Sequence, residues 1–157
     1  MTTIFDELKA DHDRHRDLLD RIARADGERS ALFEEFRVEV SAHAASEEQT
    51  LYASMMADPD LQDEARHSVA EHKEIDDYLT ELCELDPSTG EWTAKFETMR
   101  HRYLHHIEEE EEEMFVEAEE KLPDDVTALI GERFEERKPA ELEKAAQTDP
   151  SEEMHRE

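Results

Sequence analysis

Several residue types that shape other folds are scarce in this sequence. One cysteine, Cys83, stands among 157 residues, so no internal disulfide can form and nothing indicates an oxidising compartment. Three glycines and five prolines favour long helices joined by short turns. No stretch approaches the roughly 20 apolar residues of a membrane span, and the N-terminus lacks the pattern of a signal peptide. We therefore expect a soluble, cytoplasmic, all-α protein in which Cys83 packs within an apolar run.

Positive charge is also scarce. The chain has 18 lysines and arginines against 46 acidic residues, a net charge of −28. Such a surface repels nucleic acid and anionic membranes, so both are poor partners, and it attracts cations. It also keeps a protein soluble at high salt, which suggests a salt-loving source. The apolar share of 36% is low, yet a chain of this length can bury one core.

Apolar residues recur at helical spacing in four successive stretches that turn residues separate. Thr2 or Thr3 is suited to cap the first helix. The turns are predicted at Asp26-Gly27, at Asp58-Pro59, at residues 86–90 and at Pro123. Short connections make neighbouring helices antiparallel, which predicts an up-down-up-down four-helix bundle. A short fifth helix, roughly 124–138, completes a domain of residues 1–138, and residues 139–157 are expected to form a charged, disordered tail.

Each of the four long helices carries a histidine on its apolar stripe. The four are His12, His43, His72 and His106. Measured from the turn between them, the two histidines of each neighbouring pair differ in depth by one to three residues. At 1.5 Å rise per residue this mismatch is under about 5 Å. The four imidazoles should therefore occupy one layer of the bundle.

A glutamate follows two of these histidines by four residues, on the same stripe: Glu47 after His43, and Glu110 after His106. A carboxylate on a core face needs a positive partner, because an unpaired buried charge is costly. Four nitrogens and up to four carboxylate oxygens exceed what one tetrahedral zinc ion would use. The six residues predict a site for two metal ions that the glutamates bridge, with iron favoured over manganese or zinc.

Other polar residues near the stripes have weaker claims. His15 shares the inward stripe but lies one turn from His12, so we interpret it as a supporting or core residue. Asp76 or a backbone carbonyl is a candidate acceptor for the outer nitrogen of a ligating histidine. Within the acidic run 108–113, Glu110 alone fits the stripe. His67, His101 and His105 miss the stripes, and Tyr52 and Tyr103 reach only the edge of the site.

Four segments in order resemble the hemerythrin-like domains of the HHE cation-binding class. They are Leu8-Lys9-Ala10-Asp11-His12, His43-Ala-Ala-Ser-Glu47-Glu48 with Leu51-Tyr52, Glu71-His72, and His105-His106-Ile-Glu-Glu-Glu110 with Met114-Phe115. The resemblance covers about residues 4–138 and implies a bundle around a non-haem di-iron centre, with ligation at the six residues above. Asp76 stands where oxygen carriers of that family have a second histidine. Glu111, as well as Glu110, follows the last histidine at a suitable distance.

The expected function is therefore that of a di-iron protein that binds or reacts with O2, peroxide or nitric oxide, in sensing, binding or iron handling. Two alternatives stay open: a catalase-like enzyme that disproportionates peroxide at the same centre, and a metal-free helical interaction module. The sequence does not identify catalytic residues or an oligomeric state, and a sensing output would need a separate signalling or redox partner.

Overall fold

The computed structural model describes residues 2–24 and 28–148, and within them every regular element is helical, as predicted. Two of the long helices contain a short π-helical segment (η), so the elements form five rods. They are α1 (Ile4–Ala23); α2 (Arg29–Glu47) continued by η1 (Glu48–Tyr52) and α3 (Ala53–Met56); α4 (Gln62–Glu84); α5 (Gly90–Glu109) continued by η2 (Glu110–Met114) and α6 (Phe115–Lys121); and α7 (Asp124–Gln147).

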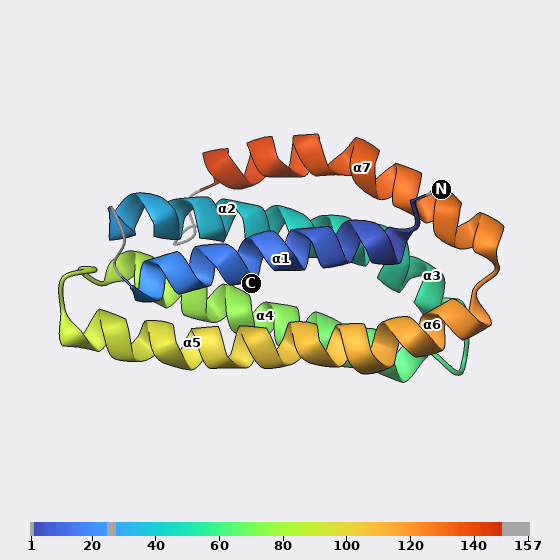
Figure 1. Ribbon diagram of the computed structural model, residues 1–157, viewed down its shortest axis with the longest axis horizontal. Helices are drawn as coiled ribbons and strands as arrows, with labels where there is room; N and C mark the ends of the chain where they lie inside the picture. Colours follow the sequence, from blue (N-terminus) through green and yellow to red (C-terminus); the bar gives the residue numbers. More distant parts are fainter. Residues whose placement is uncertain (1, 25–27, 149–157) are drawn as a thin grey trace.

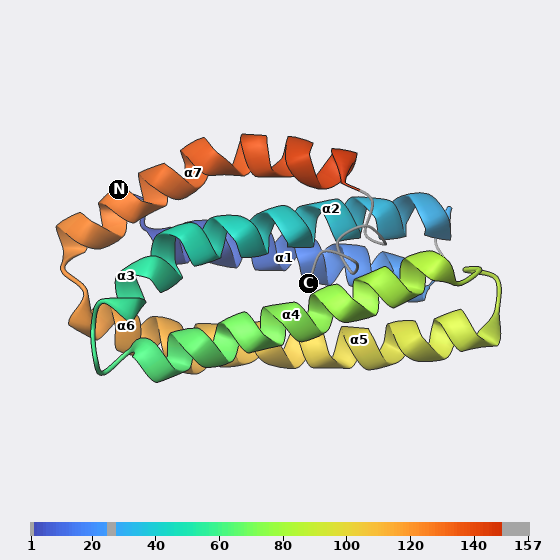
Figure 2. The ribbon, with the colours of Figure 1, turned by 180° about the vertical axis from the view of Figure 1, so that it is seen from behind.

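The rods pack in three layers (Figure 1). α1 lies beside α2, α4 lies beside α5, and these two antiparallel pairs form the four-helix bundle. Seen from behind, α4 runs along α5, and α7 lies on the far side of α2 from both (Figure 2). The last helix therefore covers α1 and α2 from outside the four-helix bundle. None of the described helices is long and apolar enough to cross a membrane.

Local capping fixes where two of the helices begin. The Thr3 side chain accepts a hydrogen bond from the Asp6 backbone N–H, while the Asp6 carboxylate accepts one from the Thr3 backbone N–H at 3.1 Å. Thr89 caps α5 by accepting from the Trp92 backbone N–H at 3.2 Å. Such caps satisfy backbone donors that a helix leaves unpaired. The break expected at Asp26-Gly27 lies outside the described residues.

The last helix corrects the predicted domain boundary at residue 138. α7 continues through Pro139 to Gln147, so residues 139–147 are helical and not part of a disordered tail. Proline removes one helical hydrogen bond, but contacts with the bundle hold the helix on both sides of it. Lys138 Nζ lies 2.6 Å from Asp11 Oδ1, and the Gln49 side chain donates to Glu141 at 3.2 Å. Residues 149–157 lie outside the described part of the chain.

One smaller expectation, in α4, was wrong. Cys83 is exposed, because it follows the buried Leu82 and points to the outer side of the helix. Val69, which fitted the apolar stripe by spacing, is 39% exposed, whereas the neighbouring Ser68 is buried. Ser68 lies against the sulfur of Met114, with its hydroxyl 3.9 Å from that atom.

The core is divided into two apolar clusters with a polar layer between them. One cluster, with Phe36, Trp92 and Phe96, fills the end of the bundle near the α4–α5 turn. The other, with Phe5 and Phe115, fills the opposite end and includes residues from α7. The buried histidines and glutamates occupy the middle. Packing at both ends therefore closes this layer off from water along the bundle axis.

α7 approaches the start of α1 at Gly131. A Cβ atom built on Gly131 would lie 2.9 Å from the backbone nitrogen of Ile4 and 3.1 Å from the backbone carbon of Thr3. Real Cβ atoms do not come this close to backbone, so a side chain here would push α7 away. Glycine therefore sets the distance between the outer helix and the bundle.

We predict that Gly131→Ala lowers the free energy of unfolding by about 1–3 kcal/mol, because the clash outweighs the helix propensity that alanine gains. Gly90→Ala is the matched control, since nothing lies within 4 Å of a Cβ at Gly90. It should leave stability unchanged or raise it. Urea unfolding followed by circular dichroism measures both. Equal stabilities for the two variants would contradict the close approach of α7.

Candidate metal centre

The four stripe histidines meet in the middle of the bundle as two facing pairs. His12 on α1 and His43 on α2 have ring centroids 5.0 Å apart, and His72 on α4 and His106 on α5 are also 5.0 Å apart. His12, His43 and His106 are at most 2% exposed, and the His72 side chain is 8% exposed. The structure thus brings together one histidine from each bundle helix.

The two glutamates on the stripes lie between these pairs. Glu110 Oε1 is 2.8 Å from His106 Nε2 and 4.0 Å from His12 Nε2. Glu47 Oε1 is 3.2 Å from His72 Nε2 and 3.6 Å from His43 Nε2. Each carboxylate therefore faces one histidine of each pair. His72, His106 and Glu110 also bring one ligand atom each within 4.8 Å of one another.

Most of the inward atoms lack a regular hydrogen bond although they are buried. They are the Nε2 atoms of His12, His43 and His106, both carboxylate oxygens of Glu47, and Glu110 Oε1. Buried polar atoms nearly always have partners in folded proteins. Of these six atoms, His106 Nε2 and Glu110 Oε1 contact each other at 2.8 Å. Their convergence on one layer fits the coordination of metal ions, which bind neutral imidazole nitrogen and carboxylate oxygen.

The electrostatics of this layer reflect two carboxyl groups that are both fully buried. Burial and the nearby charge of Glu110 raise the pKa of Glu47 well above its usual range. Burial also acts to raise the pKa of Glu110, but the charge of His106 holds it well below its usual range. For His106, burial acts to lower the pKa, but the charge of Glu110 and the hydrogen bonds to Glu110 and Glu71 outweigh it and raise the pKa to about 9. Positive charge is thus favoured beside these carboxylates.

Carboxylates on the outer side of the site orient three of the histidines. Glu111 Oε2 is 2.7 Å from His12 Nδ1, Asp11 Oδ2 is 2.9 Å from His43 Nδ1, and Glu71 Oε1 is 2.8 Å from His106 Nδ1. A neutral imidazole that donates from Nδ1 presents the lone pair of Nε2 inward, as a metal ligand requires. Sequence reasoning missed these three acceptors and named Asp76, which lines a cavity between α2 and α4.

A π-helical turn follows each inward glutamate. η1 begins directly after Glu47, and η2 begins at Glu110 itself. Such wider turns are rare and occur often at functional sites. The extra residue buries two neighbours in succession, Leu51 with Tyr52 and Met114 with Phe115. The doublets lie four and five residues beyond each glutamate, and this spacing was the available indication of a π turn.

The first π turn brings Tyr52 into the site. Its hydroxyl donates to Glu110 Oε2 at 3.1 Å and lies 3.4 Å from His72 Nε2, and the side chain is almost fully buried. Tyr52 is thus a member of the site and not only a residue at its edge. His15 is also buried, but its Nδ1 lies 2.7 Å from the Tyr103 hydroxyl and its ring stacks edge-on against His43. This position agrees with a supporting role for His15.

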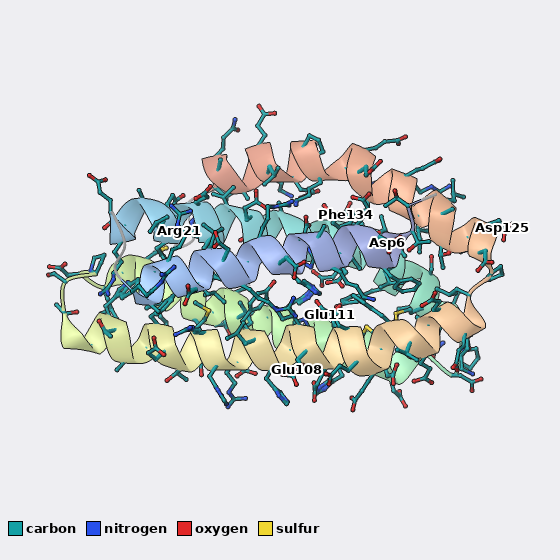
Figure 3. All side chains as sticks on the ribbon, viewed as in Figure 1. Asp6, Arg21, Glu108, Glu111, Asp125 and Phe134 are labelled. Carbon is teal, nitrogen blue, oxygen red and sulfur yellow. The ribbon has the colours of Figure 1, made fainter. Side chains whose placement is uncertain are left out.

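The remaining candidates lie outside the buried layer. In the acidic run 108–113, Glu110 alone is buried, and Glu111 is half-buried. Figure 3 shows Glu111 between the α5–α6 rod and α1, whereas Glu108 lies on the outer side of α5. His67, His101 and His105 are exposed. The helical spacing thus separated the one inward glutamate from its five neighbours.

The outer helix reaches the site through a lysine. Lys138 Nζ on α7 lies 2.6 Å from Asp11 Oδ1 and 3.4 Å from Glu39 Oε2, and its side chain is 12% exposed. Asp11 in turn accepts the hydrogen bond from His43. Phe134, on the side of α7 that faces the bundle, packs against the ring of His43 at 6.0 Å (Figure 3). α7 therefore supports one of the histidines from behind.

We predict that Lys138→Met lowers the free energy of unfolding by about 1–3 kcal/mol, because the buried Asp11 carboxylate loses a charged partner. Lys144→Met makes the same chemical change at an exposed position of α7 and should cost much less. Denaturant unfolding of the metal-free proteins measures both. If the two variants are equally stable, the Lys138–Asp11 contact does not hold α7 in place.

Comparisons with known proteins agree with this geometry. The family model of the hemerythrin HHE cation binding domain matches residues 3–118. The crystal structure of a hemerythrin HHE cation binding domain-containing protein from Mycobacterium kansasii superposes with a TM-score of 0.79 at 26% identity, covering 92% of this chain and 90% of that one. No curated protein sequence matches significantly. The chain therefore belongs to the hemerythrin HHE cation-binding domain family, a family of metal-binding, typically iron-binding, helical proteins.

Proposed function

We propose that this protein binds two iron ions in the bundle and that this centre binds or reacts with O2 or a related small oxidant. The observation that carries the proposal is the position of the two carboxylates. Each of the two carboxylates, Glu47 and Glu110, has an oxygen 2.8–4.0 Å from the Nε2 atom of one histidine in each pair. In this position Glu47 and Glu110 would serve as ligands shared between the two histidine pairs, as carboxylates do in the metal sites of other helical bundles.

The donor set favours iron. His12, His43, His72 and His106 would supply nitrogen, and Glu47 and Glu110 would supply oxygen. A mixed shell of imidazole and carboxylate suits iron and manganese, whereas structural zinc takes four ligands only. Two bound iron ions would supply electrons and open coordination positions to a small oxidant.

The surrounding residues hold the ligands and control protons. Asp11, Glu71 and Glu111 fix the tautomers of three histidines, so the ligand set is oriented before metal binds. The Tyr52 hydroxyl donates to Glu110 Oε2 and thereby holds a proton at the inner edge of the site. The apolar clusters on both sides of the layer exclude water along the bundle axis.

A cavity of about 340 Å³ between α2 and α4 suggests how a small oxidant reaches the site. His43 and His72 stand at its inner end, and its walls include Val40, Ala44 and Leu79. Glu48, Lys73 and Asp76 also line the cavity, but its walls are mostly apolar, and this favours uncharged molecules such as O2, hydrogen peroxide or nitric oxide. A catalase-like reaction at the same centre would use the same route.

We predict that protein loaded anaerobically with Fe²⁺ and then desalted retains about two irons per chain. His72→Ala should retain one or none, because it removes a nitrogen from one histidine pair. His101→Ala changes an exposed histidine of α5 and should retain the wild-type amount. Elemental analysis of the three proteins measures this.

The same experiment separates the alternatives. Equal iron content in His72→Ala and His101→Ala would refute the ligand assignment. Wild-type protein that retains no iron and melts at the same temperature with and without Fe²⁺ would instead support a metal-free interaction module.

We further predict that Ala44→Leu slows oxidation of the iron-loaded protein by O2 or peroxide several-fold, because the larger side chain narrows the cavity between α2 and α4. Iron content should not change. Ala94→Leu, at an exposed position of α5, is the control and should react at the wild-type rate. Stopped-flow absorbance measures both. An unchanged rate in Ala44→Leu would show that the oxidant enters elsewhere.

A further inference from the structure

A second cavity, of about 210 Å³, opens on the other side of α4, between this helix and α5. Its walls differ from those of the first. Six of its lining residues are acidic, and they are Asp63, Glu64, Glu71, Glu109, Glu110 and Glu113. Among the described residues that line it, none is a lysine or an arginine. This cavity therefore suits a cation, whereas the cavity between α2 and α4 has fewer carboxylates and a lysine, Lys73, in its lining.

Three side chains at the outer end of this cavity are close enough to bind one ion. His67, Glu71 and Glu109 each bring a ligand atom within 4.8 Å of the other two. His67 Nε2 is 3.5 Å from Glu71 Oε1. The side chains of His67, Glu71 and Glu109 are 66%, 22% and 38% exposed. Because the group is open to solvent, an arriving ion can reach it without any movement of the helices.

The inner end of the cavity reaches the buried centre itself. His106 and Glu110 line it, and their side chains are each 2% exposed. His106 Nε2 and Glu110 Oε1 face each other at 2.8 Å, without regular hydrogen-bond geometry. Glu71 connects the two ends, since its Oε1 is 2.8 Å from His106 Nδ1 and 3.5 Å from His67 Nε2. Ligand atoms thus continue from the surface to the buried centre.

The carboxylates around this route repel one another. Burial and the neighbouring Glu117 and Glu113 raise the pKa of Glu64 to about 7. A divalent cation would relieve this repulsion, and the net charge of −28 increases the local concentration of cations at the surface. The buried centre needs such a route, since the apolar clusters close both ends of the bundle.

We propose that His67, Glu71 and Glu109 form an outer, transient site for a divalent cation, through which Fe²⁺ passes between α4 and α5 to the buried centre. This proposal rests on the proposed function of the centre. It divides access between two faces of α4, with the ion entering on the α5 side and the oxidant on the α2 side. Glu71 takes part in both the outer site and the support of His106.

The test is the rate at which metal-free protein takes up Fe²⁺ under anaerobic conditions. The double variant His67→Ala/Glu109→Gln removes two of the three outer ligands and spares Glu71. It should load about tenfold more slowly than wild type, within the range of electrostatic steering effects, and reach the same final iron content. His101→Ala/Glu97→Gln makes the same changes at exposed positions of α5 and should load at the wild-type rate.

Further variants keep the test decisive. Glu109→Asp retains a carboxylate, so it should take up Fe²⁺ faster than Glu109→Gln and at close to the wild-type rate. If the double variant does not fold, the single variant His67→Ala, which changes only an exposed side chain, is measured in its place. A double variant that loads as fast as wild type overturns the outer site and leaves the proposed function intact. Wild-type protein that takes up no iron overturns both.

Discussion

The whole arrangement depends on two carboxylates that lie fully buried in the middle of a helical bundle. Glu47 and Glu110 are at most 1% exposed, and taking such groups out of water costs several kcal/mol each unless positive charge meets them. Apolar side chains cannot supply that positive charge, so other groups within the bundle have to supply it. The four histidines around the glutamates, and the cations that this layer favours, are the consequence. The buried polar layer therefore lowers the free energy of unfolding unless cations bind there or its side chains are protonated.

The outward contacts follow from the same constraint. Each histidine that faces a buried carboxylate must have a defined tautomer, and an acceptor at its other nitrogen provides it. The chain places these acceptors across helices. Asp11 precedes His12 but accepts from His43, and Glu71 precedes His72 but accepts from His106. Each such contact joins two helices as well as orienting a ring. Lys138 extends this network to α7, which lies outside the part of the chain that the family model matches.

Helical periodicity was sufficient to predict the all-α bundle and the inward residues, because a stripe repeats over many turns and short turns leave few topologies. It identified Glu110 within six consecutive glutamates for the same reason. It failed where the period changes. The π turns after Glu47 and at Glu110 shift the stripe by one residue, which brings Tyr52 inward. Acceptors such as Asp11 were missed because a contact across helices leaves no regular spacing. The predicted fifth helix ended before Pro139, whereas α7 continues beyond it, because contacts between α7 and the bundle cannot be recognised from the local sequence.

The two cavities on opposite sides of α4 differ in the side chains that line them. The cavity on the α2 side is lined mainly by apolar residues such as Leu79, with Lys73 and Asp76 beside them, whereas every carboxylate-bearing or basic residue other than histidine that lines the cavity on the α5 side is acidic, Glu64 among them. Both cavities end at the same buried layer, the first at His43 and His72 and the second at His106 and Glu110. A neutral oxidant and a divalent cation have opposite solvation requirements, so no single opening would admit both well. In the proposed function, two routes on opposite sides of one helix would allow metal to be replaced without opening the oxidant cavity to ions.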